Sequence, residues 1–335
     1  MNSLERIAAT VAFRKPDRVP VVPQVFGQAA VLAGVPLASY LHDGALLARC
    51  QVAALRHYGY DAVFAFADVG LEAEALGSVL EFPEGQYPQL ASPALAPGDP
   101  IGGLQVPDPE RAGRMPELLK ATRLLRGELD GAVPVVAVVT GPMSLAGQLL
   151  GTQDALYLAA DEPLRFEELL DIATATALRY GRALLAAGAQ VALVFEPAAS
   201  PAVVPPAFFR EMLLPRLRTL LGAFKQAGAL ACWLHIAGPI EPILRYYPEA
   251  GADIANVDYE VQLDVAARAL PRTCLDGNLR SLSFVLDSPA KITDEAQRLL
   301  SLLGRRGGFI LSSGCEIPPE AKPENLAALV AAVQP

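Results

Sequence analysis

One ten-residue run of the chain is apolar almost throughout: Val133-Pro134-Val135-Val136-Ala137-Val138-Val139-Thr140-Gly141-Pro142. It shows no clean alternation of apolar and polar residues, and it is rich in β-branched valine. A continuous apolar run of this length is typical of a parallel strand that is buried on both faces. The run therefore predicts one strand of a buried parallel sheet.

Comparable β-rich runs recur on both sides of this one, at 18–26, 61–68, 190–197, 230–238, 252–258, 273–278 and 308–315. Amphipathic segments rich in alanine and leucine separate many of them, at 43–58, 160–187, 206–227, 288–304 and 321–333. Eight strands that are each followed by a helix predict an α/β protein with a (β/α)8 fold, the TIM barrel.

An open, doubly wound sheet is the alternative arrangement for such a pattern. Its usual glycine fingerprint after the first strand is absent, since the sequence there reads Phe26-Gly27-Gln28-Ala29-Ala30. Residues 1–17 predict a leading helix and loop. Residues 78–115 hold many Pro and Gly residues and predict an insertion, or lid, after the second strand.

Length and composition fit one barrel domain over residues 1–335. Hydrophobic residues make up 52% of the chain and charged residues 19%, which favours a large buried core over disorder. The formal net charge is -9, and no cluster of Lys and Arg forms a basic stripe. Nucleic acid is therefore not an expected partner.

Neither a targeting segment nor a membrane span is predicted. The first 14 residues carry charges at Glu5, Arg6 and Arg14, so they lack the apolar core of a signal peptide. No stretch of about 18 uncharged apolar residues occurs. The cysteines are sparse and show no disulfide spacing: Cys50, Cys232, Cys274 and Cys315. We expect a cytoplasmic protein with reduced thiols.

Polar residues collect where the predicted strands end, which is where barrel enzymes place their active sites. They are Gln24, Gln28, Asp68, Thr140, Glu196, His235, Asn256, Asp258, Asp276, Asn278, Cys315 and Glu316. Core packing does not require polar residues at every strand end. A solvated mouth would expose some of them in any barrel, and we expect about half to contact a ligand.

Two of these residues are singled out by type and position. His235 ends a strand before Ile236-Ala237-Gly238-Pro239, and Cys315 follows Ser312-Ser313-Gly314 at the last strand end. Together with a carboxylate such as Glu196 they are ligand types that zinc accepts. A fourth, open position would make such a site catalytic.

Several motifs are spread over nearly the whole chain. They are Arg14-Lys15-Pro16-Asp17-Arg18-Val19-Pro20-Val21, Gly59-Tyr60-Asp61, Glu72-Ala73-Glu74-Ala75-Leu76-Gly77, Thr140-Gly141-Pro142-Met143-Ser144-Leu145-Ala146, Leu234-His235-Ile236-Ala237-Gly238, Gly314-Cys315-Glu316-Ile317-Pro318-Pro319 and Lys322-Pro323-Glu324-Asn325. Taken together, they resemble the uroporphyrinogen decarboxylase superfamily. The closest branch looks like the cobalamin-dependent methyltransferases, which move a methyl group between a corrinoid (methylcobamide) protein and a thiol or folate acceptor. The resemblance implies a TIM barrel and a partner protein that carries methylcobalamin.

The decarboxylase branch implies residues that this chain mostly lacks. Its arginine- and glycine-rich segment after the first strand, which grips the carboxylates of the tetrapyrrole, falls on 24–30, where no arginine occurs. Its tyrosine falls on Gln148, a candidate substrate contact here, and its C-terminal histidine falls on Cys315. The aspartate after the second strand is kept as Asp68. Porphyrinogen decarboxylation is therefore the second hypothesis, with Asp68 central.

The methyltransferase branch implies a zinc site made of His-x-Cys and a later Cys. His235 and Cys315 match its first and last members, whereas Ala237 stands in place of the middle cysteine. Loss of a thiolate weakens zinc binding, and Glu196 would have to complete the site. A zinc ion there would bind the acceptor thiol and lower its pKa.

Without zinc, the resemblance leaves a folate acceptor, whose reacting amine needs protonation or a hydrogen bond. Asp68, Glu196 and Asp258 are then the candidate catalytic residues. Gln24, Gln28, Thr140, Asp276 and Asn278 are candidate substrate contacts. A third hypothesis is a non-catalytic barrel that binds a corrinoid or a partner protein after losing its metal site, as the replacement at Ala237 suggests.

Overall fold

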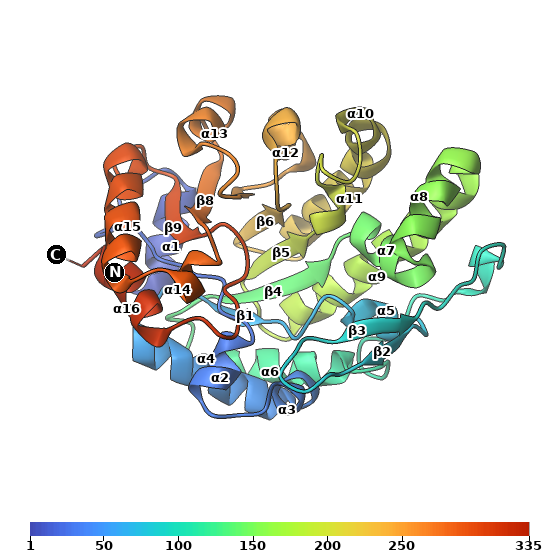
Figure 1. The fold of residues 1–335 in the computed structure, drawn as a ribbon, viewed down its shortest axis with the longest axis horizontal. Coiled ribbons are helices and arrows are strands. Elements are labelled where there is room, and N and C mark those ends of the chain that lie inside the picture. The colour runs from blue at the N-terminus through green and yellow to red at the C-terminus, as the bar shows by residue number, and fades with distance from the viewer. Residues whose placement is uncertain (335) are drawn as a thin grey trace.

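The computed structural model describes residues 1–334 and is built around a parallel sheet of seven strands (Figure 1). In spatial order these are β1 (Val63–Ala65), β4 (Val135–Thr140), β5 (Val191–Phe195), β6 (Ala231–His235), β7 (Ile254–Val257), β8 (Cys274–Leu279) and β9 (Phe309–Ser313). The order along the sheet follows the order along the chain, and the sheet is curled like part of a barrel. The predicted α/β class and parallel sheet are confirmed.

Helices pack against the outer face of the sheet. The main ones are α4 (Gly44–Tyr58), α6 (Met115–Glu128), α9 (Pro163–Ala186), α11 (Leu214–Gln226), α13 (Leu263–Ala269), α15 (Pro289–Leu303) and α16 (Pro323–Ala331). Shorter helices precede, follow or connect them: α1 (Ser3–Val11), α2 (Gln28–Leu32), α3 (Leu37–His42), α5 (Leu71–Ala75), α7 (Pro142–Leu150), α8 (Thr152–Asp161), α10 (Pro206–Phe208), α12 (Tyr247–Ala250) and α14 (Ser283–Leu286). Three 3-10 helices are η1 (Ile101–Gly103), η2 (Pro197–Ala199) and η4 (Glu241–Tyr246), and η3 (Phe209–Leu213) is a π-helical turn.

The five helices predicted between strands are all present, with two changes of extent. The segment 160–187 becomes α9 only from Pro163, because α8 ends at Asp161 and proline suits the first turn of a new helix. The segment 206–227 is interrupted by the π-helical turn η3 before α11 begins at Leu214. The leading helix is α1, which Asn2 and Glu5 begin with a reciprocal capping box.

The first predicted strand, 18–26, is not a regular strand, and this prediction is wrong in that respect. The segment makes one isolated bridge, between Val21 and Leu311. Its backbone nevertheless bonds on both sides: Val22 N donates to Leu311 O at 2.9 Å, and Asp61 N donates to Val21 O at 2.8 Å. Pro20 and Pro23 have no backbone N–H, so a continuous ladder is impossible. The segment therefore spans the gap between β9 and the start of β1 without strand geometry.

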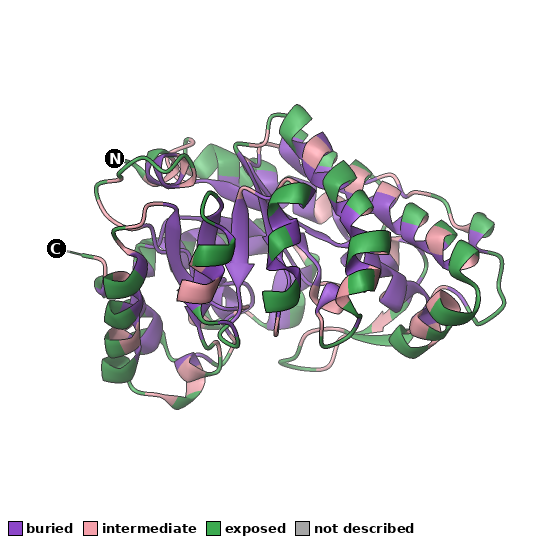
Figure 2. Cartoon of the chain, turned by 90° about the horizontal axis from the view of Figure 1, so that it is seen from above, coloured by how far each residue is buried: buried purple, intermediate pink, exposed green. Residues whose placement is uncertain are grey.

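Two apolar clusters hold the fold together. The larger lies between the sheet and the helices, and Figure 2 shows buried strands beneath helices whose outer faces are exposed. The smaller lies inside the curl of the sheet and includes Phe26, Phe64, Phe66, Phe195 and Trp233. Alternate residues of each strand point to these two clusters, which is why the strands are apolar on both faces.

The segment 78–115 contains an exposed antiparallel hairpin, β2 (Val79–Glu81) and β3 (Gln89–Ser92). Ser78 anchors its start, since the Ser78 hydroxyl donates to Gln148 O at 3.1 Å. Arg114 anchors its end through an ion pair with Asp68 at 2.6 Å. Among residues 1–334, no helix is long and apolar enough to cross a membrane.

Candidate functional site

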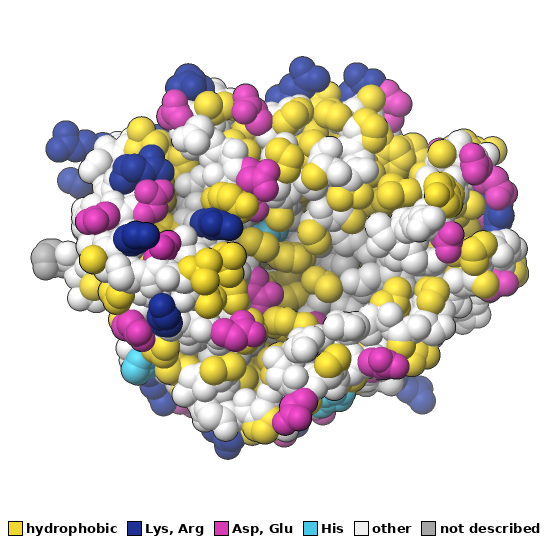
Figure 3. All heavy atoms as spheres, viewed as in Figure 1, with side chains coloured by type: hydrophobic (Ala, Val, Ile, Leu, Met, Phe, Trp, Pro, Cys, Tyr) yellow, Lys and Arg dark blue, Asp and Glu magenta, His cyan; other side chains and the backbone are white. Residues whose placement is uncertain are grey.

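The carboxyl ends of the seven strands lie along one edge of the curled sheet, as they must in a parallel arrangement. Figure 3, drawn in the view of Figure 1, shows this face hollowed over the ends of β4, β5 and β6. Hydrophobic and acidic side chains surround the hollow. The polar strand-end residues therefore lie around one hollow.

Four polar side chains form a continuous inner polar arc, which we define as Gln24, His235, Asn256 and Asp276. Each is 0% exposed. The last three lie two residues beyond Trp233, Ile254 and Cys274, which belong to the apolar cluster inside the curl. Because side chains alternate along a strand, these three polar residues face inward as well. Gln24 lies between Val22 and Phe26, which belong to the same apolar cluster.

Strand register places the arc residues side by side. Asn256 pairs with Asp276 in the ladder between β7 and β8, and its Nδ2 donates to Asp276 Oδ2 at 3.1 Å. Leu234 pairs with Ala255, which places His235 next to Asn256. Sequence reasoning identified these residues by their position at strand ends, and the structure brings them together.

Burial disfavours the charged forms of the titratable groups of the arc. It lowers the pKa of His235 to about 3, because the imidazolium would lose its hydration. It also raises the pKa of Asp276 well above its usual value, although the hydrogen bond from Asn256 acts in the opposite direction. The arc is thus a surface rich in hydrogen-bonding atoms on which burial opposes charge.

An aromatic wall lies beside the arc on the same inner face. Ring centroids of Phe26 and Phe66 are 4.8 Å apart, and those of Phe66 and Phe195 are 6.1 Å apart. Phe195 also contacts the His235 ring, with centroids 4.4 Å apart and an interplanar angle of 36°. The inner face therefore offers a polar side and an aromatic side.

Both carboxylate oxygens of Glu196 bind the start of a helix. Its Oε1 accepts a hydrogen bond from Met143 N at 2.7 Å, and its Oε2 accepts one from Ser144 N at 3.0 Å. These are free N–H groups of the first turn of α7, where a carboxylate is stabilised. Burial raises the pKa of Glu196 to about 7. A Cβ at Gly141 would lie 2.4 Å from Glu196 Cδ, so glycine makes room for this contact.

Thr140 and Asp68 also have partners that occupy their polar atoms. Thr140 N donates to Glu72 Oε1 at 2.7 Å, and the Thr140 hydroxyl lies 3.0 Å from Glu72 Oε2. Burial raises the pKa of Glu72 to about 7. Asp68 is paired with Arg114, whose Nε also contacts Glu74 at 2.6 Å. The ion pair ties the end of segment 78–115 to the strand end after β1.

Asp258 and Asn278 join the loops after β6 and β7. Asp258 Oδ2 accepts a hydrogen bond from Gly238 N at 3.0 Å, and its Oδ1 accepts one from Glu260 N at 3.2 Å. The Asn278 amide donates to the backbone oxygens of Asp258 at 3.2 Å and Val261 at 2.8 Å. Both side chains therefore support the rim of the site.

The remaining predicted contacts lie near helices. Gln28 begins α2, and its Nε2 donates to the Tyr58 hydroxyl at 2.9 Å while its Oε1 has no partner. Gln148 lies on α7, and its Oε1 is buried without a partner. Neither Gln28 nor Gln148 forms a hydrogen bond with a residue of the inner polar arc.

The loop after β9 brings Cys315 and Glu316 to the mouth. Burial raises the pKa of Cys315 to about 12 and that of Glu316 to about 8. Tyr87, between β2 and β3, reaches this loop: its hydroxyl donates to Glu316 Oε1 and accepts a hydrogen bond from Gly27 N at 2.7 Å. The hairpin is thus fastened to the mouth at its tip.

The residues present do not fit the predicted zinc site. Among residues 1–334, no group of three or more His, Cys, Asp and Glu side chains is arranged to hold a metal ion. Both oxygens of Glu196 bind the start of α7, and Ala237 supplies no ligand atom. The set His235, Cys315 and Glu196 is therefore not assembled as a metal centre.

Sequence reasoning missed the roles of Glu72, Tyr87 and Arg114. Their partners are distant in the chain: Tyr87 and Glu316 are 229 residues apart, and Arg114 and Asp68 are 46 apart. No local pattern identifies such pairs. A glutamate among apolar residues, as in Leu71-Glu72-Ala73, was the one available signal that Glu72 is buried.

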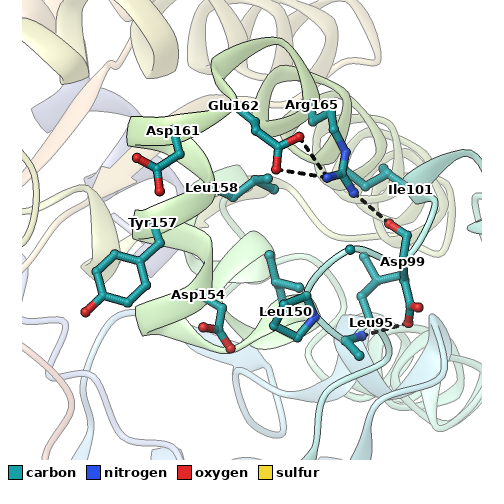
Figure 4. A pocket seen from close by; sticks show the side chains of 13 residues that line it. Leu95, Asp99, Ile101, Leu150, Asp154, Tyr157, Leu158, Asp161, Glu162 and Arg165 are labelled. Carbon is teal, nitrogen blue, oxygen red and sulfur yellow. Dashed lines mark hydrogen bonds and ion pairs between the residues drawn. The ribbon is translucent and has the colours of Figure 1, made fainter.

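A separate cavity of about 200 Å³ lies between the loop around residues 95–101 and helices α8 and α9 (Figure 4). Its floor is apolar, and its carboxylates include Asp154 and Asp161. Arg165 there is paired with Glu162 at 2.9 Å. No strand-end residue of the mouth lines this cavity, so it is distinct from the candidate site.

Comparison with known proteins identifies one family. Its sequence model, described as uroporphyrinogen decarboxylase (URO-D), matches residues 2–335. A uroporphyrinogen decarboxylase of Anaeromyxobacter sp. (strain Fw109-5) is 29% identical over 91% of this chain and 89% of that protein. A methylcobamide:CoM methyltransferase MtaA of Methanosarcina barkeri is 30% identical over 73% of this chain and 68% of that protein.

A solved structure resembles the fold closely. It is described as a methyltransferase from Methanosarcina mazei, and the comparison gives a TM-score of 0.90 at 27% sequence identity. The match covers 99% of this chain and 98% of that one. The similarity therefore extends over the sheet, its helices and the strand ends.

Proposed function

The chain belongs to the uroporphyrinogen decarboxylase family, and from this premise we propose that it transfers a methyl group between a corrinoid protein and a thiol or folate acceptor. The observation that carries the proposal is the match to the Methanosarcina mazei methyltransferase over nearly all of both chains. The methylcobamide:CoM methyltransferase relative supports the same chemistry. We further propose one domain, a (β/α)8 barrel closed by residues 20–22, acting in the cytoplasm with no nucleic acid or membrane partner.

The charge of the mouth favours methyl transfer over porphyrinogen decarboxylation. A tetrapyrrole with several carboxylates needs cations that can grip them, as arginine does. Here the polar residues on the inner side of the strand ends are neutral or acidic. Arg114 is already paired with Asp68 and Glu74, and Arg280 after β8 lies over the Tyr259 ring. The segment after residue 23 supplies glutamines in place of arginines. An acceptor with fewer carboxylates than a porphyrinogen suits this surface better.

Transfer to a thiol requires that the methyl–cobalt bond of the corrinoid substrate break with both electrons left on cobalt. The carbon–sulfur bond forms, and the thiol proton must leave. Glu316 is suited to accept that proton, because its pKa of about 8 places it close to half-ionised near that pH. Transfer to a folate amine follows the same balance, with a nitrogen–carbon bond formed and the N–H proton released.

We assign supporting roles to three residues that the sequence favoured as catalytic. Asp68, Glu196 and Asp258 each accept hydrogen bonds or ion pairs at both carboxylate oxygens. A carboxylate that is already occupied is a poor proton carrier. We therefore propose that they position the lid segment, α7 and the rim loops, and no step is assigned to zinc.

The proposal is tested by incubating the full chain with methylcobalamin and either tetrahydrofolate or 2-mercaptoethanesulfonate. The methylated acceptor is then measured by mass spectrometry. Glu316→Gln should lower kcat at pH 8 by roughly 10- to 100-fold, the scale of a lost general base. The exposed Glu168 on α9 provides the control, since Glu168→Gln should leave kcat unchanged. No methylated product with any acceptor would refute the proposal.

Porphyrinogen decarboxylation is the second candidate, favoured by the family relatives that carry that name. One of them, from Xanthomonas campestris pv. campestris (strain B100), is 31% identical over 84% of this chain and 81% of that protein. Incubation with uroporphyrinogen decides between the two candidates. Release of CO2 and formation of a less carboxylated product would establish decarboxylation.

A further inference from the structure

Five buried side chains on the inner face of the sheet carry polar atoms without hydrogen-bond partners. They are Gln24 Nε2 and Oε1, Trp233 Nε1, His235 Nδ1 and Nε2, Asn256 Oδ1 and Asp276 Oδ1. Trp233 is 2% exposed, and the other four are 0% exposed. Buried polar groups in folded proteins nearly always have a partner, whether protein, water or ligand. Such a concentration in one place points to a bound molecule.

The five side chains lie on neighbouring elements. Asn256 and Asp276 face each other across β7 and β8, and His235 lies beside Asn256 on β6. Trp233 lies two residues below His235 on the same strand and the same face. The unpaired atoms are therefore grouped on one side of the inner face, under the hollow over the strand ends seen in Figure 3.

The unpaired atoms include both hydrogen-bond donors and acceptors. Gln24 supplies a donor and an acceptor, Trp233 a donor, and Asn256 and Asp276 an acceptor each. His235 adds two ring nitrogens, Nδ1 and Nε2. A partner must therefore present several donors and acceptors where it contacts the arc.

The aromatic wall restricts the shape of the partner. Phe66, Phe195 and the His235 ring form a sequence of contacting rings that adjoins the arc. Aromatic faces favour a flat ring stacked or inserted beside them. A small alkyl thiol offers neither a flat ring nor more than one weak hydrogen-bonding group, so it would leave most of the arc unpaired.

We propose that the inner polar arc binds the ring of a reduced pterin, a planar nitrogen heterocycle bearing amide and amino groups, so that folate is the methyl acceptor. The inference rests on the proposed function and names its acceptor class. The ring amine attacks the methyl carbon, a nitrogen–carbon bond forms, and the carbon–cobalt bond breaks with its electrons left on cobalt. The N–H proton of the amine passes to Glu316, as in the proposed function.

Binding is measured by anaerobic titration calorimetry with the full chain, using tetrahydrofolate and 2-mercaptoethanesulfonate as probes. Tetrahydrofolate should bind with a Kd at least 10-fold lower than that of the thiol. Gln24→Met keeps the length of the side chain and removes two unpaired atoms. It should weaken tetrahydrofolate binding at least 10-fold without lowering the Tm of the ligand-free protein, because no existing hydrogen bond is lost.

A matched control is Tyr247→Phe, which also removes one unpaired buried polar atom, but on α12 and outside the arc. It should leave binding unchanged. The inference is overturned if tetrahydrofolate does not bind, or if Gln24→Met binds it as tightly as the native protein does. Methyl transfer to the thiol without folate binding would refute the inference alone. Folate binding without methyl transfer to any acceptor would support it and refute the proposed function.

Discussion

The Tyr87 hydroxyl donates a hydrogen bond to Glu316 Oε1 and so fastens the tip of the β2–β3 hairpin to the loop after β9. The Tyr87 hydroxyl oxygen also accepts a hydrogen bond from Gly27 N at 2.7 Å, and a Cβ at Gly27 would lie only 2.6 Å from this oxygen. Three segments distant in the chain thus meet at one tyrosine. The rest of the hairpin is largely exposed, so this contact holds it over the mouth.

We predict that Tyr87→Phe releases the hairpin. Two hydrogen bonds are lost, each with a net contribution of about 1 kcal/mol, which is enough to raise the open population of an exposed segment. Hydrogen exchange should accelerate at residues 79–92, and the KM for the acceptor should rise several-fold. Tyr157→Phe is the control, because Tyr157 is 57% exposed on α8. Unchanged exchange in the hairpin would contradict the prediction.

We predict that stability falls as pH rises from about 5 to 8. The folded-state pKa values of Glu72 and Glu196 are about 7 and that of Glu316 is about 8, all raised from 4.5 by burial. Above pH 4.5 the unfolded chain ionises first, so the folded state binds more protons in this range. The stabilisation that the three protonated glutamates contribute is complete below pH 4.5, and it is lost as pH rises through their folded-state pKa values.

Glu72→Gln isolates one of these groups. Its amide would donate to the Thr140 hydroxyl, which lies 3.1 Å from Val69 O and would donate there in turn. The free energy of unfolding, measured with urea, should depend less on pH in the variant. Its change between pH 5 and 8 should be smaller than that of the native protein by up to about 3 kcal/mol. If the free energy of unfolding changes with pH equally in the variant and the native protein, then Glu72 does not titrate in this range.

Much of the fold was predictable because the strands are apolar on both faces and follow one another in the sheet. Runs such as 133–142 and 190–197 therefore marked strands without knowledge of their neighbours. The exception, 18–26, has the composition of a strand, but its prolines remove ladder donors. Position at a strand end likewise predicted that His235, Asn256 and Asp276 lie together.

The state of each side chain was not predictable in the same way. Glu196 has the chemistry of a metal ligand, but the first turn of α7 occupies both its oxygens. Asp68 has the chemistry of a catalytic acid, but Arg114 binds it from the far end of an insertion. Such partners arrive through tertiary packing, so residue type and spacing do not reveal them.

Two glycine substitutions should change stability in opposite directions. Gly141→Ala would place a methyl group 2.4 Å from Glu196 Cδ, and overpacking of this kind typically costs about 1–3 kcal/mol. Gly222 lies in α11 with open space around its Cβ position, so Gly222→Ala should stabilise the protein by about 1 kcal/mol. Chemical denaturation measures both. If Gly141→Ala leaves the free energy of unfolding unchanged, then Glu196 does not hold α7 tightly.

The replacement at position 237 gives the sharpest test of the metal question. Ala237 is two residues beyond His235, which is the spacing that the family resemblance assigns to a zinc thiolate. We expect the native protein to bind far less than one zinc ion per chain, because Ala237 supplies no ligand atom and both oxygens of Glu196 bind the start of α7. Ala237→Cys should raise zinc content toward one per chain, measured by elemental analysis after dialysis, and Ala237→Ser should not. If the native protein already holds one tightly bound zinc ion, then His235 and Cys315 form a metal centre and folate specificity cannot be argued from a metal-free arc.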